Sequence, residues 1–111
     1  MKCNSPLAAA VLAIAALCVV CAPALAQING PDRKEFVDSS RQSCSASIHK
    51  NNAKLPADVV ETYCSCMAEA EADMTTQADV QYMTAHNAAP EDYTARVRAL
   101  APACKTKAGL K

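Results

Sequence analysis

The chain has 111 residues, with 11 basic and 11 acidic side chains, a formal net charge of zero and two glycines. Its length corresponds to one small domain. The scarcity of glycine excludes a glycine-rich phosphate-binding loop, and the charge balance argues against the basic surface that nucleic-acid binding requires.

Residues 1–26 have the pattern of a secretory signal peptide. Lys2 gives a positive start, residues 7–20 are almost wholly apolar, and Pro23 precedes the small residues Ala24 and Ala26. This anatomy predicts cleavage before Gln27 and export to the periplasm or the cell exterior. The alternative is an uncleaved membrane anchor, because residues 7–26 are just long enough to span a bilayer. Once the segment is removed, we expect no stable membrane insertion.

Residues 27–111 are predicted to form one all-α domain, a small disulfide-stapled bundle of three to four short helices. The helices run from Pro31 to about Asn51, from Pro56 to about Met74, from about Thr76 to His86, and from Pro90 to a basic, frayed tail at Lys105–Lys111. Prolines suit first turns, and the carboxylates of Asp32 and Glu35 suit the positive end of a helix. Thr76 and Asp79 have the spacing of an N-terminal capping pair. No segment alternates with period two, so no strand is predicted.

The spacing of apolar residues predicts which helix is central. The second helix carries two apolar stripes, so we expect a neighbour on each of its flanks. The stripes are Val60, Cys64, Met67 and Met74 on one side and Val59, Tyr63, Cys66 and Ala70 on the other. The other inward faces are Phe36, Val37, Ser40, Cys44 and Ile48 on the first helix, Val80 and Met83 on the third, and Tyr93, Val97, Leu100 and Cys104 on the fourth.

Four cysteines remain after the leader: Cys44, Cys64, Cys66 and Cys104. An even count in a short exported chain indicates a disulfide framework. Side chains two positions apart on a helix are separated by about 200° around its axis. Cys64 and Cys66 therefore face opposite sides and do not pair with each other. Two pairings remain: Cys44–Cys64 with Cys66–Cys104, or Cys44–Cys66 with Cys64–Cys104. Antiparallel register favours the first, because Cys44 lies about as far before the first turn as Cys64 lies after it.

Other interpretations of these residues remain open. A soft-metal carrier for copper or zinc would draw its ligands from sulfur and imidazole groups. Those groups are Cys64, Cys66, Met67, Met74, Met83, His49 and His86. A thiol–disulfide exchange protein would need a Cys-x-x-Cys motif at a helix start, whereas Cys64-x-Cys66 is shorter and lies inside a helix.

The sequence contains no catalytic motif, so we expect a non-enzymatic role without a cofactor, as a structural module or through contacts with an unidentified protein partner. Helix positions Glu69, Glu71 and Asp73 form an acidic strip. The basic residues Arg96, Arg98, Lys105, Lys107 and Lys111 lie toward the C-terminus. Opposite charges at two ends of a molecule can steer a partner or self-association.

Part of the sequence resembles a class of small exported bacterial proteins with a Tyr-Cys-x-Cys signature. The residues that carry the resemblance are Phe36, Arg41-Gln42-Ser43-Cys44 and Tyr63-Cys64-Ser65-Cys66. The resemblance covers residues 36–74. It implies helices and disulfides, and no activity or site residue follows from it.

Overall fold

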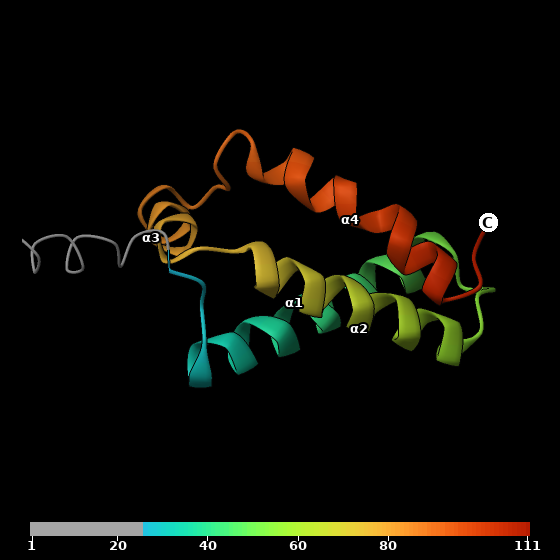
Figure 1. The fold of residues 1–111 in the computed structure, drawn as a ribbon. Helices are drawn as coiled ribbons and strands as arrows, with labels where there is room; N and C mark the ends of the chain where they lie inside the picture. The colour runs from blue at the N-terminus through green and yellow to red at the C-terminus, as the bar shows by residue number, and fades with distance from the viewer. Residues whose placement is uncertain (1–25) are drawn as a thin grey trace, which may run out of the picture.

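The computed structural model describes residues 26–111, and within them the chain is all α-helical apart from connecting segments. The helices are α1 (Gly30–Asn51), α2 (Ala57–Met74), α3 (Gln77–His86) and α4 (Tyr93–Lys107) (Figure 1). The predicted helical fold and element order are confirmed. Within residues 26–111, none of the four helices combines the length and apolar composition of a bilayer span. The predicted leader lies outside the described residues, except for Ala26.

Local chemistry explains where the helices begin and end. Gly30 opens α1 with φ of 58°, and Pro31 occupies its first turn. The predicted capping pair of α3 is present: Asp79 N donates to Thr76 Oγ1 at 3.1 Å, and Thr76 N donates to Asp79 Oδ2 at 2.9 Å. Asn87, in the left-handed conformation at φ 50°, ends α3.

The fourth helix differs from the prediction at both ends. It begins at Tyr93 rather than at Pro90, because residues 91 and 92 form a turn. It continues past Pro102 to Lys107, so Lys105 and Lys107, which were expected in a frayed tail, belong to its last turn. A further turn follows, in which Leu110 N donates to Lys105 O at 2.8 Å.

The helix α2 is central, as its two apolar stripes predicted. It packs against α1 on one flank and α4 on the other, while α3 lies across one end of the molecule (Figure 1).

The preferred disulfide pairing is present. Cys44 is bonded to Cys64 with Cα atoms 5.6 Å apart, and Cys66 is bonded to Cys104 with Cα atoms 5.5 Å apart. Each flank of α2 is therefore covalently tied to its neighbour.

The core is small and is built mainly from short side chains. On α2 the buried residues recur at intervals of four: Val60, Cys64, Ala68 and Ala72. The expected core residues Met67 and Met74 are only half-buried, whereas the alanines Ala68 and Ala72 are buried. The helix α1 contributes no fully buried residue, since its inner face is rich in serine.

The segment before α1 completes the core. Ile28 is only 3 % exposed, a burial that the sequence did not indicate. Gln27 pairs with Thr76 in an isolated antiparallel bridge, in which Gln77 N donates to Ala26 O at 2.9 Å and Ile28 N donates to Thr75 O at 3.4 Å. These bonds hold the start of the described chain against the junction of α2 and α3.

Candidate functional site

A cluster of hydrogen-bonded polar side chains lies where α2, α3 and α4 meet. Arg96 donates two hydrogen bonds to the buried carboxylate of Asp79, one from Nη2 to Oδ1 at 2.7 Å and one from Nη1 to Oδ2 at 3.2 Å. The hydrogen bonds from Arg96 lower the pKa of Asp79, and the same contact raises the pKa of Arg96. Arg96, expected in a basic C-terminal surface, instead joins α4 to α3.

A second set of bonds extends this polar junction. The Thr75 and Tyr93 hydroxyls lie 2.9 Å apart, and Tyr93 also donates to Glu71 Oε1 at 2.9 Å. Burial raises the pKa of the Tyr93 phenol, so this group stays protonated at neutral pH. Thr75 donates to the Glu71 carbonyl at 2.7 Å. Because these groups bond to one another, the junction ties the end of α2 to the start of α4.

All four cysteines that were predicted to form a disulfide framework are bonded in disulfides. Cys64 and Cys104 are almost fully buried, and all four sulfurs are bonded as disulfides, so none is a thiolate ligand or nucleophile in this state. The structure also separates the other soft-metal candidates. His49 lies near the end of α1 and His86 at the end of α3, where its ring stacks on Tyr82 with centroids 4.0 Å apart. No group of three metal-ligating His, Cys, Asp or Glu side chains occurs in the part of the chain that the structure describes.

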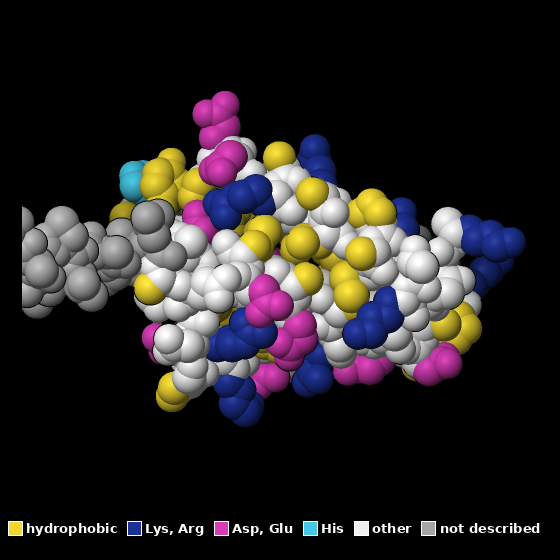
Figure 2. All heavy atoms as spheres, viewed as in Figure 1, with side chains coloured by type: hydrophobic (Ala, Val, Ile, Leu, Met, Phe, Trp, Pro, Cys, Tyr) yellow, Lys and Arg dark blue, Asp and Glu magenta, His cyan; other side chains and the backbone are white. Residues whose placement is uncertain are grey.

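The predicted acidic strip of α2 is divided between two partners. Arg33 of α1 contacts Glu69 at 2.7 Å and Asp73 at 2.9 Å, whereas Glu71 faces Tyr93. Figure 2 shows hydrophobic side chains along the line where α4 lies over α2, with acidic and basic side chains interspersed below it. This face is therefore mixed in charge rather than uniformly acidic.

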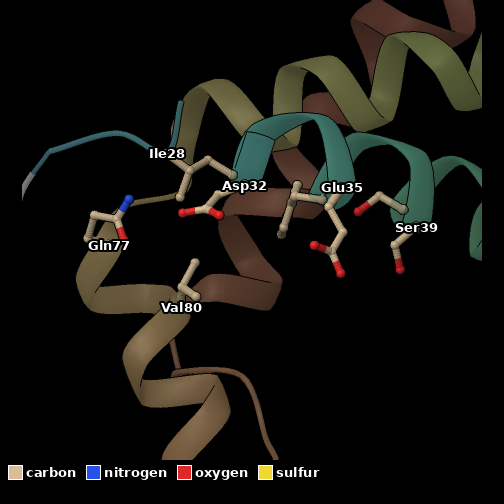
Figure 3. Close-up of a pocket in the computed structure, with 8 residues that line it drawn as sticks. Ile28, Asp32, Glu35, Ser39, Gln77 and Val80 are labelled. Atoms are coloured by element: carbon tan, nitrogen blue, oxygen red, sulfur yellow. The ribbon is translucent and has the colours of Figure 1, made fainter. Parts of the chain in front are cut away.

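A concave surface lies between α1, α3 and the segment before α1, and we call it the α1–α3 groove. Its apolar floor consists of Ile28, Phe36 and Val80, and its volume is about 360 Å³. The polar side chains around it are Asp32, Glu35, Ser39, Ser40 and Gln77. In Figure 3, Asp32, Glu35 and Ser39 extend from α1, while Gln77 and Val80 come from α3. The groove is therefore assembled from three separate stretches of chain.

The groove is negatively charged. Asp32 and Glu35 line it and make no ion pair within residues 26–111, and no basic residue lines the groove. The next carboxylate along α1 contrasts with them, because Asp38 contacts Lys34 at 2.6 Å. The hydrogen bond from Lys34 lowers the pKa of Asp38.

A second hollow adjoins the groove and shares Ser39 and Ser40 with it. It lies among α1, α2 and α4, has a volume of about 410 Å³, and is lined on its apolar side by Tyr63, Met67 and Val97. Sequence reasoning placed Phe36 and Val80 on inward faces but did not identify either hollow. Asp32 and Glu35 were interpreted only as partners of the helix dipole, and no local pattern shows that they face α3.

Comparisons with protein-family models, with curated proteins and with solved structures found no match to this chain.

Proposed function

We propose that this protein is an exported, disulfide-stabilised helical module that acts by binding another protein and catalyses no reaction. The observation that carries the proposal is the α1–α3 groove, an open apolar surface formed by three chain segments on a covalently stabilised scaffold. Hollows that combine an apolar lining with a few polar groups are common binding sites.

The chemistry of the groove supports binding rather than catalysis. The hydroxyls of Ser39 and Ser40 make no hydrogen bond to a histidine or a carboxylate in the described residues. Nucleophilic catalysis needs such a base beside the hydroxyl. The groups with shifted pKa values in the polar junction, Asp79, Tyr93 and Arg96, are bonded to neighbouring side chains.

Site-specific photo-crosslinking in the native host tests the proposal. A photoreactive phenylalanine analogue replaces Ser39, which is exposed beside the groove, or Ala57, which is exposed at the start of α2. We expect a discrete crosslinked protein from position 39 and none from position 57. Folded protein that gives no crosslink from position 39, or the same pattern from both positions, would contradict the proposal.

Three measurements on protein purified from the periplasm separate the remaining classes. We expect N-terminal sequencing to begin at Gln27, no free thiol after unfolding, and no bound metal. Two or more free thiols with bound copper or zinc would favour the soft-metal carrier. Fully reactive thiols without metal would favour a thiol–disulfide exchange protein.

A further inference from the structure

We propose that the α1–α3 groove binds an extended segment of the partner protein in which an apolar side chain lies next to lysine or arginine. This inference rests on the proposed function and specifies the chemistry of the partner. It follows from the floor of the groove, the charges beside it and its continuation into the second hollow.

The floor suits an apolar side chain. Ile28 is held in place by the hydrogen bond from its N–H to Thr75 O at 3.4 Å, next to the Gln27–Thr76 bridge. Phe36 and Val80 are half-buried and remain partly exposed to the groove. The groove has a volume of about 360 Å³ and is open to solvent. A partner side chain that enters it removes apolar surface of its own and of the floor from water.

The carboxylates select a cation beside that apolar side chain. Asp32 and Glu35 are three positions apart on α1, so they share a face of the helix with each other. The two basic residues between them are engaged elsewhere: Arg33 contacts Glu69 and Asp73 of α2, and Lys34 contacts Asp38. The other elements that line the groove contribute Ile28, Gln77 and Val80, none of which is charged. The charge at the groove is therefore left for a partner to neutralise.

The shape favours an extended peptide over an isolated small cation. Ser39 and Ser40 connect the groove to the second hollow, whose lining includes Ser43. Asp32 and Ser43 are 11 positions apart on α1, which corresponds to a length of about 16 Å along the helix at 1.5 Å per residue. An extended chain covers that length with about five residues. The serine hydroxyls and the Gln77 amide can bond to its backbone.

A second copy of this chain is a less favourable occupant. Its basic C-terminal end carries one large apolar residue, Leu110, beside Lys111. That residue is half-buried and its N–H is bonded to Lys105 O at 2.8 Å, so the tail would have to unwind before it could enter a groove.

Fluorescence anisotropy with defined peptides tests the inference on the mature protein. The probe is a labelled peptide Ser-Lys-Leu-Arg-Phe-Lys-Ser, and the charge-reversed comparison is Ser-Glu-Leu-Asp-Phe-Glu-Ser. We expect the basic peptide to bind and the acidic one not to bind. The double variant D32N/E35Q should weaken binding of the basic peptide about fivefold, the amount expected for two exposed ion pairs. Val80→Ser should weaken binding by altering the floor while leaving the charge unchanged.

A matched control separates this groove from general charge attraction. The double variant D58N/E61Q removes two carboxylates at the same spacing from the N-terminal part of α2, of which Glu61 contacts Arg41 at 3.4 Å. It should bind the basic peptide as the parent does. Equal weakening by both double variants, or no binding of the basic peptide by the parent, would overturn the inference.

The crosslinking experiment distinguishes failure of the inference from failure of the proposed function. If the crosslink from position 39 persists unchanged in a D32N/E35Q background, the protein binds a partner but not through these charges, which overturns the inference alone. If the protein without peptide sediments as an oligomer that D32N/E35Q dissociates, the occupant is a second copy and the inference is likewise overturned. Circular dichroism confirms that each variant remains folded.

Discussion

Removal of the two disulfides, one at a time, tests how this small core is stabilised. The perturbations are the paired variants C44A/C64A and C66A/C104A. Alanine is used because Cys64 and Cys104 are 0 % and 1 % exposed, and a serine hydroxyl at either position would be buried. The two closed loops are consecutive in the chain and share no residue, so their effects on the unfolded state should be independent.

Chain entropy gives the expected magnitudes. The paired cysteines are 20 and 38 residues apart. Restricting loops of these lengths in the unfolded chain stabilises the fold by about 3.3 kcal/mol for Cys44–Cys64 and about 3.9 kcal/mol for Cys66–Cys104. A domain of this size has a total stability of about 4–13 kcal/mol. We therefore expect each paired variant to be markedly destabilised and the fully reduced protein to be largely unfolded at 37 °C.

The assay is urea unfolding followed by circular dichroism at 222 nm, with linear extrapolation to water. Reduced parent protein serves as a control, because it lacks both disulfides but keeps every side chain. A thiol count after unfolding verifies that each variant retains its other disulfide. A loss below about 1 kcal/mol in either paired variant would refute the entropic reasoning, since the model gives about three times that loss.

Three further outcomes are expected. Ile28→Ala should destabilise the fold by about 2 kcal/mol in urea unfolding, because it empties a buried position between α1 and α3; no measurable loss would mean that the segment before α1 is not docked. Tyr93→Phe should cost about 1 kcal/mol by removing the hydroxyl that donates to Glu71, and an unchanged midpoint would contradict the bonded junction. Asp79→Asn should cost about 2 kcal/mol at pH 7 through its cap and its bonds to Arg96. Because Arg96 lowers the pKa of Asp79, that stabilisation is complete at neutral pH and is lost as the pH falls below about 4. The parent should therefore lose stability through this range, whereas Asp79→Asn should lose less of it.

The helices were predictable because their signals are local. First-turn prolines, the Thr76–Asp79 capping pair and the Asn87 terminator each act within a few residues. The opposite orientation of Cys64 and Cys66 follows from helical geometry alone. It excludes the disulfide pairing that joins these two cysteines and leaves two of the three possible pairings. Antiparallel register then favoured the pairing that the structure contains.

The contents of the core were less predictable. The sequence favoured Met67 and Met74 by hydrophobicity, yet Ala68 and Ala72 are the residues that α2 buries along with Val60 and Cys64. The distance between two packed helices depends on the side chains of both helices. The hydrophobic pattern of one helix therefore does not predict it. The burial of Ile28 has the same origin, since an isolated apolar residue before a helix has no periodicity to identify it.

For this chain, the sequence alone determined the helical class, the order of the helices and the sides of α2 on which the cysteines lie, because each depends on torsions and spacing within one segment. The tertiary structure alone decided that Arg96 joins α4 to Asp79, that Ile28 is buried, and that Asp32 and Glu35 face an apolar groove. Those features depend on how α3 and the segment before α1 lie against the other helices. Residues far apart in the chain meet there, and their contacts are set by packing across the whole domain.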